Sequence, residues 1–457
     1  MKTSLRPFRM GWAFAFFNAT TWQVALGTPL VLLAESVGAT VFEVGLLYSF
    51  LFLMTPVQVF STALLPRFGY KNLMLFGWGT RALCLLVPIY LAWTRPSNPE
   101  QWHVNILILS MFLFAFLRSV GNCSFIPWMY SILPEKARGR YFANEQIFSG
   151  IAGVGTLIAC SVFFFAVPLH DAFLWQYGMA IAGALLSWYA LKKIPDGTPP
   201  DRIDLKLVLR EAPKLCFRRS RYRQFLWSSV LFTICSAPIV PFSIYFLRVE
   251  ARLEPGQIII FTTLQYFGAI AGSLFIRNFI DHTGPRVFFR ISIALYSAVA
   301  FAWWTMLQRE EAWGVPLLVV YFLLGMAASA WVSANLNYLP RLTSERERPL
   351  RVSVHGAVTA FLGGLSPIVW GLFLRGQDAS GAQTMNTNAF QIFFVFVILS
   401  QLILLWNVRY FRARKTDTTP IVLAGAMGRP IRSLGTLVDL VTRRNNRGKK
   451  PSAEGSD

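Results

Sequence analysis

Charged residues are scarce in this chain, at 14% of 457 residues, whereas soluble domains carry about 25%. Hydrophobic residues instead make up 54% of the sequence, and the mean hydropathy is +0.48. A water-soluble core of ordinary design cannot hide that much apolar surface, which excludes a soluble globular protein. The apolar residues come in runs of roughly 20, the length that crosses a hydrocarbon layer about 30 Å thick. The sequence therefore predicts an all-α membrane protein, since lipid offers no water to exposed backbone groups.

Cysteine and histidine are also rare. The five cysteines form no CxxC pair, and only Cys216 lies outside the apolar runs, in a basic loop. The four histidines, His103, His170, His282 and His355, are scattered over different runs and loops. These patterns predict no disulfide framework, no metal site and no cofactor. No Gly-rich nucleotide loop or nucleophile elbow is present either, so we do not expect an enzyme.

The net charge of +21 would suggest a nucleic-acid partner if the protein were soluble. No nucleic-acid-binding motif supports that interpretation. Lys and Arg instead concentrate in alternate loops between the apolar runs, as orientation by positive charge requires. We therefore expect the basic loops and tail to face anionic lipid headgroups, no nucleic acid to bind, and the protein to be a monomer.

Twelve apolar runs are long enough to be spanning helices. The first, from Gly11 to Leu33, is too long for the core of a signal peptide, and we expect it to be retained as a span. The predicted spans cover residues 11–33, 44–65, 72–93, 104–127, 146–168, 173–191, 223–247, 257–280, 287–308, 315–338, 353–374 and 388–410.

Basic residues in the short loops predict the orientation. Arg67 and Lys71 lie between the second and third spans, and Lys136, Arg138 and Arg140 lie between the fourth and fifth. The loop between the first two spans carries none. This asymmetry places both termini in the cytoplasm, and we expect the plasma membrane, the inner one in a bacterium.

The longest internal connection covers residues 192–222 and divides the chain into two groups of six spans. It begins with the Pro-rich KKIPDGTPP and continues with apolar residues at helical spacing, which predicts an amphipathic helix on the membrane surface. We expect six-helix bundles at 1–191 and 223–411. Residues 412–457 form a basic cytoplasmic tail, for which a surface helix and disorder both remain open.

Two short markers occur once in each group of six. LLPRFGYK (64–71) and FIDHTGPR (279–286) both have Gly at the sixth place and a basic residue at the eighth, and lie 215 residues apart. GNCSFIP and ANLNYLP both place Asn five residues before Pro, at Asn122 and Asn335, 213 residues apart. Two markers in the same order at nearly the same offset indicate a duplicated six-span unit.

The first marker resembles the signature G-x-x-x-D-R-x-G-R-R/K that follows the second helix in the major facilitator superfamily. The first copy has Pro66 in place of the acid, which the second copy keeps as Asp281. The segments 34–49 and 133–143 also resemble this family, and the resemblance extends over roughly residues 8–412. It implies a transporter that works by alternating access between two six-helix halves. The matching positions are Arg67, Gly69 and Lys71 in one copy and Asp281, Gly284 and Arg286 in the other.

Each glycine of the turn permits a positive φ and a tight connection between helices. The neighbouring cations hold topology at the headgroups and complement helix C-terminal carbonyls. The resemblance implies that such turns lock the halves together on the cytoplasmic side, although topology alone would also explain them. Pro66 is expected to help end the second helix, which leaves Asp281 with more of the lock. The predicted inner gate comprises Arg67, Gly69, Lys71, Asp281, Gly284, Arg286, Arg138 and Arg140.

Ionisable groups inside the membrane are costly and usually functional. Arg118 lies in the middle of the fourth span and is expected to bind an anionic group of a substrate or a counter-carboxylate. Arg81 lies in the third span, which is normally peripheral in this family. Asn18 and Trp22 share one face of the first span, as a cavity wall requires. The predicted substrate-binding residues are Arg118, Asn122, Asn18, Trp22, Asn335 and Trp331.

Structural roles remain open for each of these residues. Arg118 could bind backbone carbonyls, and the stripe on the first span suits helix packing as well as a cavity. Asn122 and Asn335 could cap or kink helices ahead of the prolines that follow them.

Acidic residues are missing from the middle of every predicted span. Glu145, near the inner end of the fifth span, and His355 are therefore the candidates for coupling transport to protons. Facilitated diffusion and exchange remain open. The expected function is movement of a small, anionic or amphipathic solute, and the alternatives are a lipid translocator or a transporter-like sensor that signals through its tail.

Overall fold

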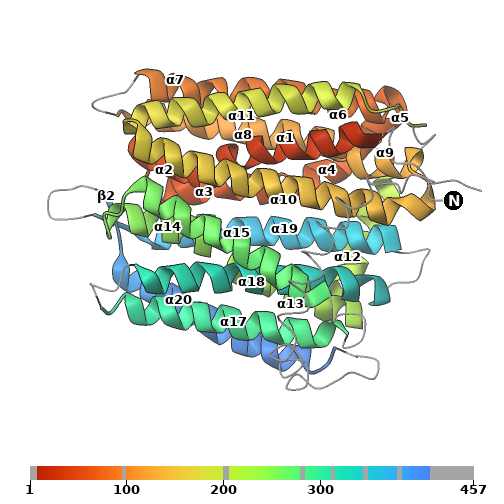
Figure 1. Ribbon diagram of the computed structural model, residues 1–457. Coiled ribbons are helices and arrows are strands. Elements are labelled where there is room, and N and C mark those ends of the chain that lie inside the picture. The colour runs from red at the N-terminus through yellow and green to blue at the C-terminus, as the bar shows by residue number, and fades with distance from the viewer. Residues whose placement is uncertain are drawn as a thin grey trace, which may run out of the picture.

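The computed structural model describes residues 8–94, 99–198, 205–277, 284–309, 314–342, 348–377 and 383–411. Long helices run side by side through the molecule, and the prediction of a highly helical membrane protein is confirmed (Figure 1). Ten helical stretches of the described residues are long and apolar enough to span a membrane. They are Val41–Phe68, Tyr70–Thr94, Gln101–Ile132, Asn144–Ala166, Arg221–Val249, Pro255–Ile276, Pro285–Met306, Val315–Tyr338, Leu350–Phe373 and Thr387–Val408.

The first and sixth predicted spans are not among these ten. The first is divided into α1 (Arg9–Ala25) and α2 (Thr28–Ser36), because the chain leaves the helix at Leu26 and Gly27. The sixth corresponds to α11 (Leu169–Lys192), which is long enough but less apolar. The count of twelve spans stays a prediction.

Other spans in the first half are also built from consecutive helices. The second consists of α3 (Val41–Leu53), α4 (Thr55–Ser61), the 3-10 turn η2 (Thr62–Leu64) and α5 (Leu65–Phe68). Pro66 does not end this span as expected. It lies in the first turn of α5, where its missing N–H costs nothing, and the chain stays helical to Phe68.

The rest of the first half is helical as well. It contains α6 (Tyr70–Cys84), α7 (Leu86–Thr94), α8 (Gln101–Asn122), α9 (Phe125–Ile132), α10 (Glu135–Ala166) and α11. Asn122 is the last residue of α8, and Ser124 Oγ donates a hydrogen bond to the carbonyl of Gly121 at the break before α9.

The second half begins after a helix in the predicted linker. This helix, α12 (Leu205–Phe217), confirms that the connection is partly helical. A two-stranded antiparallel hairpin pairs Arg375 with Met385. The further elements are α13 (Arg221–Ser236), α14 (Ile239–Val249), α15 (Pro255–Arg277), α17 (Pro285–Met306), α18 (Val315–Tyr338), η3 (Leu339–Leu342), α19 (Arg348–Phe373), β1 (Arg375–Gln377), β2 (Gln383–Met385) and α20 (Thr387–Val408).

The two halves lie beside each other, with the N-terminal helices together in the upper part of Figure 1 and the C-terminal helices below them. Helices α3 and α19 pack along the seam. A Cβ on Gly364 of α19 would lie 2.7 Å from Cβ of Phe52 in α3, so the absence of a side chain permits this approach. We call the end that carries Gly69 and Gly284 the turn end, and the end that carries Glu35 and Arg248 the ion-pair end.

Candidate functional site

The two repeated turns have the same backbone geometry. Gly69 has φ 74° and ψ 168°, and Gly284 has φ 76° and ψ 166°. Each residue lies directly before the helix that follows, α6 or α17. Positive φ favours glycine, so the expectation for these two positions is confirmed.

The basic residue two places after each glycine binds a backbone carbonyl. Lys71 Nζ donates to the carbonyl of Ile194 at 2.9 Å, and Arg286 Nη2 donates to the carbonyl of Arg409 at 2.8 Å. In both halves the acceptor lies 123 residues after the donor. Ile194 follows the end of α11 and Arg409 follows the end of α20, so each cation complements the C-terminal end of the last helix of its own half.

The remaining members of the predicted inner gate are less well defined. Arg67 is exposed, and its guanidinium lies 5.5 Å from the centroid of the Phe68 ring. Asp281 lies outside the described residues, as do the side chains of Arg138 and Arg140. A lock between the halves at the turn end stays a prediction.

A buried polar cluster surrounds Asn18 on α1. Asn18 Oδ1 accepts hydrogen bonds from Arg81 Nη2 at 2.6 Å and from Trp78 Nε1 at 3.1 Å. The Arg81 guanidinium also lies 4.0 Å from the centroid of the Trp78 ring and 5.2 Å from that of Phe114. Arg81 is only 1% exposed, so this cation of α6 is sealed between α1 and α8.

Arg118 of α8 lies against the next turn of α1. Its guanidinium is 4.6 Å from the centroid of the Trp22 ring, and both side chains are half-buried. Asn18 and Trp22 are four residues apart on α1 and therefore share a face. The structure thus brings together three of the predicted residues and adds Arg81. The presence of Arg81 inside an apolar span was the signal for it in the sequence.

The other predicted substrate-binding residues lie elsewhere. Asn122 is half-buried, and its Nδ2 donates to Oε1 of Gln58 in α4 at 3.3 Å. Asn335 is half-buried near the end of α18. Trp331 is 5% exposed and stacks on Phe232 with a centroid distance of 3.6 Å, which places it in the aromatic core of the second half.

The two coupling candidates lie in different halves. Oε2 of Glu145 in α10 is buried and has no hydrogen-bond partner among the described residues. His355 in α19 is 6% exposed and stacks on Phe225 at 5.2 Å, and its buried Nε2 also lacks a partner in the described part of the chain. The coupling role of both residues stays a prediction.

Polar contacts join the two halves toward the ion-pair end. Thr28 Oγ1 donates to Oγ1 of Thr262 at 3.0 Å, and Tyr266 OH donates to Oε1 of Gln23 at 3.0 Å. At the end itself, Nε of Arg248 in α14 lies 3.2 Å from Oε2 of Glu35 in α2.

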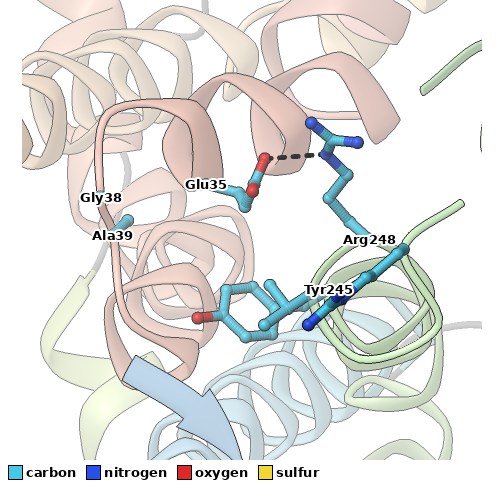
Figure 2. Close-up of a pocket in the computed structure, with 7 residues that line it drawn as sticks. Glu35, Gly38, Ala39, Tyr245 and Arg248 are labelled. Carbon is cyan, nitrogen blue, oxygen red and sulfur yellow. Dashed lines mark hydrogen bonds and ion pairs between the residues drawn. The ribbon is translucent and has the colours of Figure 1, made fainter. Parts of the chain in front are cut away.

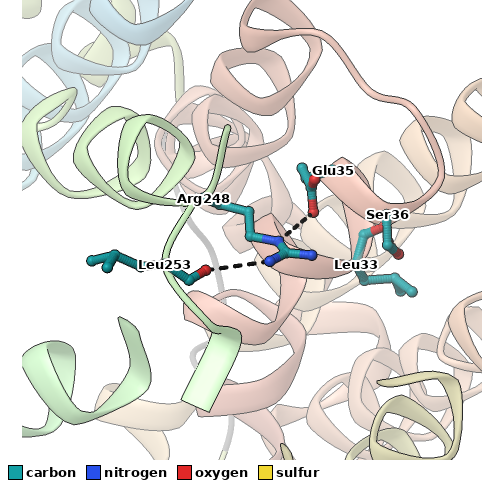
Figure 3. A network of polar contacts seen from close by, with 5 residues as sticks. All are labelled: Leu33, Glu35, Ser36, Arg248 and Leu253. Atoms are coloured by element: carbon teal, nitrogen blue, oxygen red, sulfur yellow. Dashed lines mark hydrogen bonds and ion pairs between the residues drawn. The ribbon is translucent and has the colours of Figure 1, made fainter. Parts of the chain in front are cut away.

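Arg248 is held on two sides, as Figure 3 shows. Its Nε faces the carboxylate of Glu35, and its Nη1 donates to the carbonyl of Leu253 at 3.2 Å. A cavity of about 500 Å³ opens beside this ion pair, between the α2–α3 connection and α14 (Figure 2). Its lining residues are Glu35, Gly38, Ala39, Tyr245, Arg248, Val249 and Arg252. No group of three or more His, Cys, Asp or Glu that could hold a metal occurs in the described ranges.

Solved structures of several transporters share this fold at low sequence identity. The nucleoside transporter NupG has a TM-score of 0.63 and 16% identity, over 88% of this chain and 99% of that one. The peptide transporter POT, in complex with sulfate, has a TM-score of 0.66 and 11% identity, over 89% and 96%. A bacterial metal transporter has a TM-score of 0.60 and 14% identity, over 90% and 98%.

These solved structures are named for different substrates, so the shared fold leaves the solute open. A comparison with curated protein sequences found no match. The sequence model of the Major Facilitator Superfamily, in contrast, matches residues 11–249 and 240–444, which together cover most of the chain. The chain therefore belongs to the Major Facilitator Superfamily.

Proposed function

We propose that this protein moves a small solute across the membrane by alternating access between two six-helix halves. The observation that carries the proposal is the pair of matched turns. Lys71 binds the carbonyl of Ile194 and Arg286 binds that of Arg409, with the same separation of 123 residues in each half. Two internally repeated halves that meet around a central site are a common transporter architecture.

Two six-helix halves require twelve membrane spans. In the proposal, α1 with α2 supplies the first span and α11 supplies the sixth, in addition to the ten long apolar stretches. Helix α11 lies among the other long helices in Figure 1, which supports a membrane location for it.

The turn end faces the cytoplasm in the proposed orientation, and both termini lie on that side. The excess of basic residues in the loops at this end supports the assignment. The inner membrane of a bacterium is the proposed location. Anionic headgroups are the proposed partners of the basic linker and tail.

The described conformation is proposed to be inward-facing. Glu35 with Arg248 and Thr28 with Thr262 join the halves toward the outer, ion-pair end. At the turn end, Lys71 and Arg286 bind carbonyls of their own halves. The inner gate would form when the halves rock to close the turn end. Its proposed members are Arg67, which is exposed, and Asp281.

The solute is proposed to bind in the first half beside Arg118, Trp22 and Asn18. Half-buried polar side chains on neighbouring helices suit a site that must open and close. Asn122 with Gln58 extends this polar surface along α8 and α4. Asn335 is the proposed contribution of the second half.

Cross-linking across the ion-pair end tests alternating access. We would replace Glu35 and Arg248 by cysteine in a cysteine-free background, reconstitute the protein in proteoliposomes, and apply a short bifunctional thiol reagent. The expected result is loss of solute counterflow when the halves are joined. Counterflow that continues unchanged in fully cross-linked protein would contradict alternating access.

A matched pair on one helix controls for the reagent. Glu211 and Lys214 form an ion pair of 2.7 Å within α12, three residues apart. Cysteines at these two positions can be cross-linked without joining the halves. We expect counterflow to survive there.

A further inference from the structure

Two arginines lie inside the first half, and the described residues supply no counter-charge to either. Arg81 is 1% exposed, and its Nε has no hydrogen-bond partner among these residues. The Arg118 guanidinium lies over the ring of Trp22, 4.6 Å from its centroid. Within the described part of the chain, neither guanidinium has a carboxylate partner. A charge inside a membrane is costly unless an opposite charge compensates it, so these two arginines favour the binding of an anion.

The orientation of the Asn18 amide follows from its two neighbours. Arginine and the indole of tryptophan have hydrogen-bond donors and no acceptor. Arg81 Nη2 and Trp78 Nε1 both lie within hydrogen-bond distance of the same Asn18 atom, at 2.6 Å and 3.1 Å. That atom must be the amide oxygen, which removes the usual ambiguity of an asparagine side chain.

The Nδ2 of Asn18 is therefore a free donor. Its oxygen is occupied on the buried side by Arg81 and Trp78, and no described group accepts a hydrogen bond from its nitrogen. Asn18 is half-buried, as is Trp22 one turn farther along the same face of α1, and the half-buried Arg118 of α8 lies over the Trp22 ring. A guanidinium and an amide N–H without a described partner thus belong to half-buried side chains at neighbouring turns of α1.

We propose that Arg118 and Nδ2 of Asn18 form a binding site for an oxyanion group, and that Arg81 and Trp78 are positioning residues that fix the Asn18 amide. The site rests on the proposed transport function and names its substrate class, which is a small organic anion with a carboxylate-like group. Arginine with a neighbouring N–H donor matches the two oxygens of such a group. Arg81 adds positive charge that no side chain of the described residues neutralises.

Matched pairs of charged and neutral probes test the site. Benzoate and phosphate would be compared with benzamide and sodium chloride at equal ionic strength, by the shift in melting temperature of the purified protein in a neutral detergent. We expect both oxyanions to stabilise the protein and benzamide to have no effect. A repeat with added anionic phospholipid distinguishes a free solute from a lipid headgroup.

Substitution of the binding residues should weaken the oxyanions selectively. Arg118→Gln removes the charge and Asn18→Leu removes the free donor, and each is expected to raise the Kd for benzoate about 10-fold or more. Unchanged benzoate binding by Arg118→Gln would overturn the site.

The positioning role of Arg81 and Trp78 needs a measurement that a loss of folding alone would not explain. Arg81→Met should weaken benzoate binding, and Arg81→Lys, which keeps a donor toward Asn18 Oδ1, should restore most of it. Trp78→Phe removes the second donor and is expected to weaken binding by severalfold, which keeps the test available if Arg81→Met fails to fold. Trp188→Phe is the matched control, because Trp188 Nε1 donates to the carbonyl of Leu75 and not to Asn18. Equal binding by Trp78→Phe, Trp188→Phe and the unmodified protein would overturn the positioning role.

The outcomes separate the substrate class from transport itself. Stabilisation by benzamide as strong as by benzoate, or none by any oxyanion, overturns the proposed class. Stabilisation by anionic phospholipid alone assigns the site to a lipid headgroup and overturns the class as well. If benzoate binds as expected but shows no counterflow in sealed proteoliposomes, the binding site stands and the transport function fails. If a neutral solute shows counterflow that Arg118→Gln leaves unchanged, transport stands and the anion site is wrong.

Discussion

Gly69 holds a backbone conformation that side chains rarely adopt, with φ 74° and open space around the place of a Cβ. Replacement by alanine would therefore cost conformational energy without a steric clash. We expect Gly69→Ala to lower the free energy of unfolding by about 1 kcal/mol, measured by denaturation of the purified protein.

A helical glycine with equally open surroundings provides the control. Gly150 lies within α10, and no atom would lie within 4 Å of an added Cβ. Gly150→Ala should leave stability unchanged or raise it by about 0.5–1 kcal/mol, because alanine favours a helix more than glycine does. Equal losses at the two positions would contradict the role given to positive φ.

Glu145 carries a buried carboxylate oxygen without a described partner, which suits a group that binds and releases a proton. Glutamine has nearly the same shape but cannot ionise. We expect Glu145→Gln to lose most of the uptake driven by a pH gradient while solute exchange at equal pH continues. The comparison of both assays in one batch of proteoliposomes measures this. Gradient-driven uptake at the unmodified rate would remove Glu145 from the coupling mechanism.

The sequence identified part of the Asn18 cluster and missed the rest for a physical reason. The spacing of Asn18 and Trp22 predicts a shared helical face, and Arg118 is conspicuous inside an apolar run. Which face of α6 packs on α1 depends on tertiary packing, so the sequence alone did not connect Arg81 with Asn18. Trp331 was predicted to bind substrate but lies in the aromatic core of the second half. The sequence cannot distinguish these places, because an aromatic residue suits both a cavity wall and a packed core.

At the scale of the helices, α2 and α14 are tied by the ion pair between Glu35 and Arg248. The two side chains are 23% and 24% exposed, so the pair is worth about 0.5–1 kcal/mol. Glu35→Gln should therefore shift the population toward the outward-facing state by about two- to fivefold. Gln58 is half-buried in the described conformation, which is proposed to be inward-facing. Labelling of a cysteine placed there would report the shift as slower modification.

Exchange of the two charges is the control for the ion pair. The double variant Glu35→Arg and Arg248→Glu should recover the original labelling rate, because it restores the attraction between the two positions. If Glu35→Gln alone labels like the unmodified protein, the ion pair does not bias the two states.

Helix α19 carries two glycines that should respond differently to the same substitution. A Cβ on Gly364 would meet Phe52 at 2.7 Å across the seam, whereas nothing lies within 4 Å of the corresponding position at Gly356. Gly364→Val is expected to push α3 and α19 apart and slow counterflow about 10-fold or more, and Gly356→Val should transport normally. Similar rates for both variants would show that the α3–α19 contact is not needed for transport.

The sequence predicted the spans better than it predicted the helices inside them. A hydropathy average over about 20 residues is insensitive to a single residue that leaves the helix. The breaks at Leu26 and Met54 were therefore invisible, although each divides a predicted span. The break at Cys123 was open as an alternative, because Asn122 could cap or kink a helix ahead of Pro127. The glycine turns were predictable because a positive φ has a sequence signature of its own.

For the whole molecule, deletion of the basic tail distinguishes a transporter from a sensor. A sensor of this fold would signal through residues 412–457, whereas a transporter works through its helices. We expect deletion of residues 413–457 to leave the initial rate of uptake per molecule within about twofold, measured in proteoliposomes with equal amounts of inserted protein. Loss of signalling together with normal uptake would show that the tail has a second role, and loss of uptake would contradict a dispensable tail.

The matched hydrogen bonds of Lys71 and Arg286 also bear on ancestry. Lys71 lies at the start of α6 and binds the carbonyl after α11, and Arg286 lies at the start of α17 and binds the carbonyl after α20, with the same separation of 123 residues. If the two halves arose by duplication, a single ancestral polypeptide of half the present length would already have formed this hydrogen bond between its own helices. Two such polypeptides could have assembled as a pair before their genes fused, and the Pro-rich connection with α12 would then be the younger part of the protein.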